Sequence, residues 1–203
     1  SLDPRAQFMS VERALCDFVS AYQKSYPRLL EAFDPQWRSP CELGSPFVGE
    51  DGIERILWQP LKCHPDTLTV DFSGLEKALE LPIHPDIKTY YGTFYSGGLE
   101  AEAPDGHVSL ILLWNNEDHE RLIKNLLGHA LAKRQAKTPF TVFFACTEVE
   151  SELFLSIDNE SGAIMLEKPG AKPLRRVAES MAVFLDELVP ASPDNHPERA
   201  TLL

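Results

Sequence analysis

Residues 107–147 carry the sequence HVSLILLWNNEDHERLIKNLLGHALAKRQAKTPFTVFFACT, and its pattern of apolar residues predicts the central elements of the fold. The run from His107 to Trp114 has the length of a strand and ends in the apolar stretch Leu110 to Trp114. Residues 115–137 follow with apolar side chains at helical spacing, and residues 141–147 form a second apolar run of strand length. A strand, a long helix and a buried strand in succession indicate a sheet with a helix packed against it.

The long helix has capping and charge signals at both ends. Asn115 or Asn116 can accept a hydrogen bond from the free backbone N–H groups of the first turn. Acids occupy that turn and bases occupy the last turns, which are the signs that the helix dipole favours. These charged residues are Glu117, Asp118 and Glu120 at the start, and Lys133, Arg134 and Lys137 at the end. The predicted buried face consists of Leu122, Ile123, Leu126, Leu127, Ala130 and Leu131.

Hairpins are predicted on either side of this stretch. Residues 99–103 alternate apolar and acidic side chains, and Asp105-Gly106 is a strong two-residue turn signal before the strand at His107. Downstream, residues 152–157 and 163–167 are expected to pair across the turn at 159–162. A last helix is predicted to carry Val177, Met181, Phe184, Leu185 and Leu188 on one face.

Near the start of the chain, Ser10 can cap a helix that ends before Pro27. Its apolar face is Val11, Leu15, Phe18, Val19 and Tyr22. Residues 34–52 contain three prolines and three glycines, which predicts a long irregular segment. The alternation around Ile56 and Trp58 predicts a short strand.

Between residues 68 and 98 the pattern predicts a short strand and two helices. Leu68 and Val70 suggest the strand. Ser73 and Glu76 have the spacing of a capping box for a helix that ends by residue 82. Residues 85–94 are expected to form a second helix that ends at the glycines 97 and 98, although their Thr, Tyr and Phe residues also suit a strand.

These elements predict an α+β fold: a single domain with a mainly antiparallel sheet flanked by helices. The length of 203 residues suits one domain. Residues 1–8 are expected to be a cloning remnant, residues 9–190 the domain, and residues 191–203, which are rich in proline and polar residues, a loose C-terminal tail.

The charge of the chain narrows the choice of partner. The formal net charge is −12, with 31 acids and 19 bases. Such a chain repels nucleic acid and anionic lipid, and it favours a basic partner, although a negative charge can also serve solubility alone. No window has the roughly 18 consecutive apolar residues of a membrane span, so membrane contact is expected only through a protein partner.

The sequence offers little for catalysis. The four cysteines contain no CxxC pair, which favours a reduced, cytosolic protein, and Cys16 and Cys146 are expected in the core. The six histidines show no metal-ligand spacing, so neither a metal site nor a cofactor is predicted. Cys63 or Cys146 with His129 is a conceivable nucleophile and base, but no motif brings them together. We therefore predict a binding protein and no enzyme.

The acids are more informative than the histidines. Glu100 and Glu102 are two residues apart on a predicted strand and share one face. Tyr90 and Tyr91 are close in sequence to these acids. Carboxylates among aromatic rings suit a basic peptide through ion pairs and cation–π contacts. The alternative is a solvated sheet face together with a well-capped helix.

Three segments resemble the Syd family of the SUKH superfamily. They are ILWQP at 56–60, LPIHPDIKTYYGTF at 81–94, and the stretch from Ser109 to Thr147 with its Asn-Leu-x-Gly-His-x-x-x-x-Lys-Arg pattern. The resemblance covers about residues 11–189. It implies an α+β binding domain that associates with the SecY subunit of the translocation channel (SecYEG) from the cytosolic face of the inner membrane. The implied role is regulation or quality control, through a concave acidic surface that meets basic cytosolic loops of SecY.

The charge pattern and the resemblance together predict a set of partner-binding residues. They are Glu76, Tyr90, Tyr91, Glu100, Glu102, Glu117 and Asp118. Two other functions stay open at this point. One is an immunity protein of the same superfamily that neutralises a bacterial toxin, and the other is a hydrolase that uses a histidine and a cysteine.

Overall fold

The computed structural model describes residues 10–64 and 70–196. Its centre is a seven-stranded sheet in the order β11-β10-β9-β8-β7-β6-β12, and every neighbouring pair is antiparallel. The strands are β6 (Leu99–Ala103), β7 (Gly106–Leu110), β8 (Thr141–Cys146), β9 (Phe154–Asp158), β10 (Ile164–Glu167), β11 (Arg175–Ala178) and β12 (Val189–Pro190). The predicted α+β class is confirmed.

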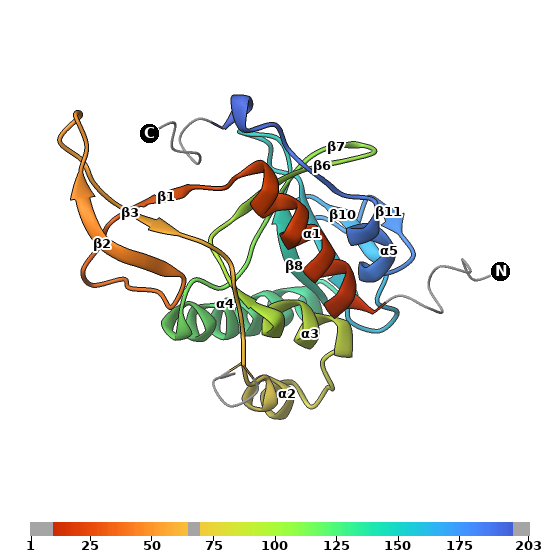
Figure 1. Cartoon of the computed structure of the whole chain (residues 1–203). Coiled ribbons are helices and arrows are strands. Elements are labelled where there is room, and N and C mark those ends of the chain that lie inside the picture. The colour runs from red at the N-terminus through yellow and green to blue at the C-terminus, as the bar shows by residue number, and fades with distance from the viewer. Residues whose placement is uncertain (1–9, 65–69, 197–203) are drawn as a thin grey trace.

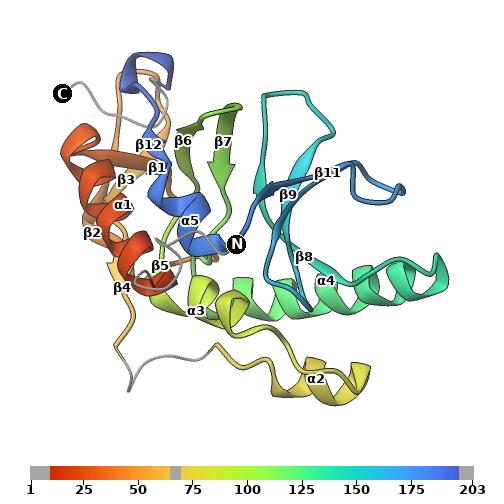
Figure 2. The ribbon, with the colours of Figure 1, turned by 90° about the vertical axis from the view of Figure 1, so that its right-hand side faces the viewer.

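Helices lie on both sides of this sheet (Figures 1 and 2). They are α1 (Val11–Ser25), α2 (Ser73–Leu79), α3 (Pro85–Thr93), α4 (Asn116–Gln135), α5 (Met181–Asp186) and the short 3-10 helix η2 (Pro193–Asn195). Helix α1 packs on α3 and α5, and α2 packs on α4. In the core, the Phe144 ring of β8 makes edge contacts with Tyr90 of α3 and Phe184 of α5, at 5.5 and 5.6 Å between centroids.

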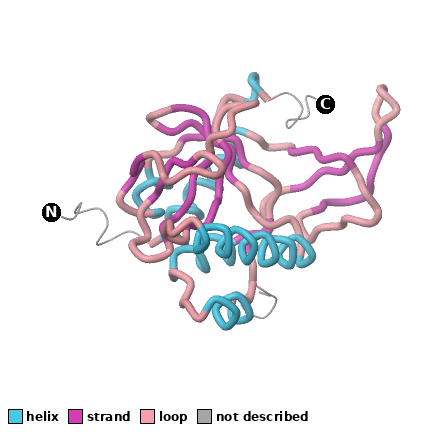
Figure 3. The backbone as a smooth tube through the Cα atoms, turned by 180° about the vertical axis from the view of Figure 1, so that it is seen from behind, coloured by secondary structure: helices cyan, strands magenta, loops and turns pink. Residues whose placement is uncertain are grey.

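A second sheet forms an arm that extends away from the seven-stranded sheet, as both sides of the molecule show (Figures 1 and 3). It consists of β1 (Leu29–Ala32), β2 (Glu42–Val48) and β3 (Glu54–Trp58) in the order β1-β3-β2. The two-residue strands β4 (Leu61–Lys62) and β5 (Phe94–Tyr95) pair nearby. At the base of the arm, the Trp58 and Trp114 rings meet edge to face at 5.4 Å.

The predicted caps at Ser10 and Asn115 and the two predicted hairpins are confirmed. The Ser10 hydroxyl accepts a hydrogen bond from the Arg13 N–H at 3.1 Å, and the Asn115 side chain accepts one from the Asp118 N–H at 2.8 Å. The Asp118 carboxylate in turn accepts a hydrogen bond from the Trp114 N–H at 3.0 Å, so two backbone N–H groups at the start of α4 are bonded by side chains. Strands β6 and β7 pair across the turn that precedes Gly106, whose φ of +139° suits glycine.

Several local predictions were wrong. The irregular segment 34–52 contains β2, an edge strand whose register shifts between Leu43 and Phe47. Gly44 and Pro46 lie within that irregularity and hide the strand from a periodicity argument. There is no capping box, because the N-cap of α2 is Phe72 and makes no side-chain cap hydrogen bond. The remaining differences concern where elements begin and end, and which side chains they bury.

The last predicted helix begins only at Met181, because Val177 belongs to β11. Strand β7 ends at Leu110, and α3 ends at Thr93. Cys146 and Leu131, both predicted to be buried, are exposed. The suggested strand near Leu68 falls partly outside the described residues, and Val70 lies in no strand.

The two ends of the predicted domain differ in what the structure describes. The suspected cloning remnant at residues 1–8 lies outside the described residues. The described part of the predicted loose tail packs on the sheet. Ala191 is buried, and its N–H donates to the Glu100 carbonyl at 2.9 Å.

Candidate functional site

The two tyrosines predicted to contact a partner lie in the core. Tyr90 and Tyr91 are 0% and 1% exposed. The Tyr90 hydroxyl donates to the Ile111 carbonyl at 2.8 Å, and the Tyr91 hydroxyl donates to the Phe143 carbonyl at 2.6 Å. Burial raises the pKa of both phenols above the ordinary value of 10. In this structure they position α3 on the sheet and offer no surface to a partner.

Glu100 and Glu102 share one face of β6, as predicted, and His107 lies between their carboxylates. The His107 Nε2 lies 2.8 Å from a Glu100 oxygen, and its Nδ1 lies 3.3 Å from a Glu102 oxygen. Glu100 is 6% exposed and also accepts a hydrogen bond from the Ser109 hydroxyl at 3.1 Å. Of the two acids, only Glu102 has much of its side chain in solvent.

The remaining predicted acids lie elsewhere. The Glu76 carboxylate accepts a hydrogen bond from the Ile83 N–H at 2.8 Å and pairs with Lys88, and these contacts lower its pKa. Glu117 is exposed at the start of α4, where Asp118 closes the cap. Helix α2 and the β6–β7 hairpin lie at opposite ends of the molecule (Figures 1 and 2). The predicted residues therefore do not form one surface.

A different group of acids does gather at one place. The His107 N–H donates to the Glu148 carboxylate at 3.1 Å, which holds the β6–β7 hairpin beside the β8–β9 loop at residues 147–153. Their tips lie side by side at the top of Figure 2. We name the carboxylates here the acidic edge: Glu102, Asp105, Glu148, Glu150 and Glu152.

The acidic edge also carries an exposed apolar side chain and little positive charge. Val149 is 83% exposed and stands between two of the acids. Two exposed ion pairs offset the edge in part, Arg175 with Asp105 at 3.0 Å and Lys168 with Glu152 at 3.9 Å. The sequence analysis missed this surface, although the alternating acids of TEVESE at 147–152 were a visible signal for it.

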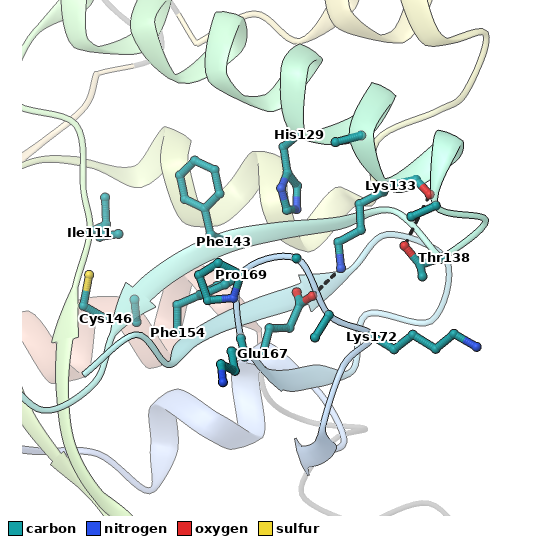
Figure 4. Close-up of a pocket in the computed structure, with 16 residues that line it drawn as sticks. Ile111, His129, Lys133, Thr138, Phe143, Cys146, Phe154, Glu167, Pro169 and Lys172 are labelled. Atoms are coloured by element: carbon teal, nitrogen blue, oxygen red, sulfur yellow. Dashed lines mark hydrogen bonds and ion pairs between the residues drawn. The ribbon is translucent and has the colours of Figure 1, made fainter.

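A pocket of about 650 Å³ lies between α4, strands β8 to β10 and the loop at 168–172 (Figure 4). Its walls are largely apolar. The lining side chains include Ile111, Ala132, Ala136, Phe143, Ala145, Phe154, Pro169 and Ala171. Lys168 and Lys172 lie in the loop that closes one side of the pocket, so this region differs in charge from the acidic edge.

A buried ion pair forms the polar wall of this pocket. Lys133 of α4 contacts the Glu167 carboxylate of β10, as the dashed line in Figure 4 shows. The second Glu167 oxygen accepts hydrogen bonds from the hydroxyls of Thr141, at 2.6 Å, and Ser156. Because three donors satisfy this carboxylate, it joins α4 to the sheet and is not poised as a general base.

Of the residues named for the hydrolase alternative, His129 and Cys146 line this pocket, whereas Cys63 does not. His129 Nε2 has no hydrogen-bond partner in the described residues, and nothing there links its ring to the Cys146 thiol. The ring packs edge to face on Phe143 at 6.0 Å. Burial lowers the pKa of His129 below 6.5, as expected for a neutral imidazole held among apolar groups.

One group of side chains could hold a metal ion. Glu100, His107 and His196 each present a ligand atom, and these three atoms lie within 4.8 Å of one another. The rings of His107 and His196 stack, with centroids 5.2 Å apart. The sequence spacing could not indicate this group, because β6, β7 and the chain after η2 contribute one residue each.

Comparison with known proteins places these features in a family. The family model described as Syd protein (SUKH-2) matches residues 10–190. The chain is 35% identical over 189 residues to Protein Syd of Colwellia psychrerythraea, covering 88% of this chain and 94% of that protein. It is 36% identical over 189 residues to Protein Syd of Pseudoalteromonas atlantica, covering 91% and 98%. Within the described ranges, no helix is long and apolar enough to cross a membrane.

Proposed function

The chain belongs to the Syd family, and on this basis we propose that it binds the cytosolic side of the SecY subunit of the translocation channel through its acidic edge. The observation that carries the proposal is the hydrogen bond between the His107 N–H and Glu148, which joins two acid-rich segments, the β6–β7 hairpin and the β8–β9 loop, and the loop also carries the exposed Val149. Family membership suggests the partner, and the acidic edge suggests the part of this chain that meets it.

The chemistry of the acidic edge suits a basic, partly apolar loop. Carboxylates at the rim of an interface attract positive charge, raise the association rate and disfavour acidic partners. Val149 is an exposed apolar side chain that a partly apolar partner loop could bury, whereas an anionic surface could not. Binding of this kind weakens as ionic strength rises, because exposed charges are screened over about 8–10 Å in physiological salt.

The proposed role is regulation or quality control of the channel by a protein held peripherally at the cytoplasmic face of the inner membrane. Its attachment there is through SecY. The formal net charge of −12 opposes direct binding to anionic lipid or nucleic acid. We propose binding without catalysis, because the pocket holds a fully bonded carboxylate and a histidine whose Nε2 bonds to no other side chain of the described residues.

Charge reversal with a matched control tests the proposal. The edge variant carries Glu148→Lys, Glu150→Lys and Glu152→Lys. The control carries Glu31→Lys, Glu50→Lys and Glu54→Lys, which change three exposed acids on the arm. Both triple variants alter the net charge equally. Binding to SecYEG in proteoliposomes is expected to weaken at least about tenfold in the edge variant and much less in the control.

Equal loss in the two triple variants would show that only the overall charge matters. Retained binding in the edge variant would contradict the proposal that SecY binds the acidic edge. Glu117→Lys tests the accessible carboxylate at the start of α4 in the same assay. Each substituted acid except Glu148 is exposed and holds no part of the core together, and Glu152 makes only an exposed ion pair with Lys168, so circular dichroism is expected to show unchanged folding.

A further inference from the structure

The described end of the chain lies against both the sheet and α1, where the Tyr26 hydroxyl donates to the Ala191 carbonyl at 2.8 Å. Strand β12 pairs with β6 over only two residues, Val189 with Glu102 and Pro190 with Ala101. Beyond it, the Ala191 N–H donates to the Glu100 carbonyl at 2.9 Å. Helix η2 then brings His196 onto the ring of His107. A polar cluster therefore lies where the end of the described chain meets the β6–β7 hairpin.

We infer that Glu100, His107 and His196 form a Zn²⁺ site that clasps this C-terminal segment to the β6–β7 hairpin. Two imidazoles and one carboxylate are a ligand set that zinc accepts, with a water molecule as the fourth ligand. Zinc bonds of about 2.0–2.1 Å at tetrahedral angles place ligand atoms about 3.3 Å apart. The three ligand atoms here already lie within 4.8 Å of one another, and the His107–Glu100 pair is at 2.8 Å.

Contacts around the cluster orient the ligands as metal sites require. His107 Nδ1 lies 3.3 Å from a Glu102 oxygen, so a proton held there leaves Nε2 with its lone pair free for a metal. A carboxylate behind a ligating histidine is the usual outer support of zinc sites. The Ser109 hydroxyl donates to one Glu100 oxygen at 3.1 Å, while the other oxygen is the one that faces His107 Nε2.

The burial and charge of the cluster also favour a cation. Glu100 is 6% exposed, and the His107 side chain is nearly as buried, so the protein has withdrawn a carboxylate and an imidazole from water. Zinc would bind between the Glu100 carboxylate and His107 Nε2, in place of their direct contact, and would add His196 as a third ligand. Because one ligand comes from the end of the described chain, binding would fix that segment in place.

Zinc titration of the full chain, free of any affinity tag, tests the inference. We expect one saturable Zn²⁺ site per chain by calorimetry and by competition with a chromophoric chelator. His107→Gln and His196→Gln are each expected to weaken the affinity at least about 100-fold, and Glu102→Gln about 10–100-fold. His64→Gln is the matched control, since it also removes one histidine but from an exposed position away from the cluster.

A change at His107 could disturb strand β7 and lower zinc affinity indirectly. His196 lies after the last described helix and outside the sheet, so His196→Gln tests the ligand without this complication. An affinity in His196→Gln equal to that of His64→Gln would overturn the inference, as would the absence of saturable one-to-one binding in the unmodified chain. The clasp itself is tested by hydrogen exchange. Zinc is expected to slow exchange of the Ala191 amide, and unchanged exchange with zinc bound would contradict the clasp.

Discussion

Replacing Lys133 by methionine is expected to destabilise the protein by about 3–5 kcal/mol. Lys133 is 8% exposed and Glu167 is fully buried. The replacement keeps an unbranched side chain, shorter by one heavy atom, but removes the only cation that contacts Glu167 in the described residues. The two hydroxyl groups that remain bonded to the carboxylate cannot neutralise its charge, so the folded state must hold an uncompensated buried anion.

A second substitution separates charge from packing. In Lys133→Met with Glu167→Gln, the buried charge is gone, and the glutamine carbonyl can still accept from Thr141 or Ser156. The double variant is therefore expected to recover about 2 kcal/mol or more relative to Lys133→Met alone. Lys124→Met, an exposed position on the same helix, is the control and is expected to stay within about 0.5 kcal/mol of the unmodified protein.

Urea unfolding followed by circular dichroism and tryptophan fluorescence gives the free energies, provided that the slopes agree among variants. Small domains are stable by only about 5–15 kcal/mol, so the expected loss is easily measured. The reasoning is refuted if Lys133→Met lies within about 1 kcal/mol of the unmodified protein, or if the double variant is no more stable than Lys133→Met.

Three further predictions follow from local contacts. Tyr91→Phe is expected to cost about 0.5–1.5 kcal/mol in urea unfolding and to leave SecY binding unchanged, because its hydroxyl bonds only inside the core; reduced binding in a folded variant would contradict this. Gly97→Ala is expected to destabilise the protein by about 1–3 kcal/mol, because the new Cβ would lie 2.9 Å from the Trp58 ring. Gly128→Ala is expected to stabilise it by about 0.5–1 kcal/mol, because the new Cβ on helix α4 would meet no atom within 4 Å. Thermal unfolding that ranks the two variants in the opposite order would refute the packing argument. Burial lowers the pKa of His129, so as the pH falls the unfolded chain binds a proton at this ring before the folded chain does. The contribution of neutral His129 to the free energy of unfolding is therefore full above pH 6.5 and is lost as the pH drops through the lowered pKa. His129→Gln is expected to flatten this pH dependence, and an NMR titration that gives the ring a pKa above 6.5 would contradict the prediction.

Local signals explain why the central stretch of the fold was predictable. The capping of α4 needs only Asn115 and Asp118, which are three residues apart, so the sequence alone places the start of the helix. The turn before Gly106 likewise depends on adjacent residues. These features need no knowledge of distant strands, and the structure contains both.

Which of the predicted partner-binding residues are covered depends on contacts that are distant in sequence, and the sequence alone could not show these contacts. The residues between Tyr90 and Glu102 contain tyrosines and acids, but their spacing does not say which of them is covered. Tyr90 is buried by α3 packing on the sheet, and the Glu100 face is covered by His107 and the chain after β12. The acidic edge exists because a hydrogen bond from His107 to Glu148, 41 residues later, joins two hairpins.

Co-sedimentation with SecYEG proteoliposomes, compared with empty liposomes at low and at high salt, tests whether the acidic edge binds SecY. We expect binding that requires SecYEG, weakens as salt rises, and is lost in the triple variant at Glu148, Glu150 and Glu152. Sedimentation at low salt that is no greater than with empty liposomes would contradict the proposed partner. Binding that is indifferent to salt and to the triple variant would contradict the acidic edge.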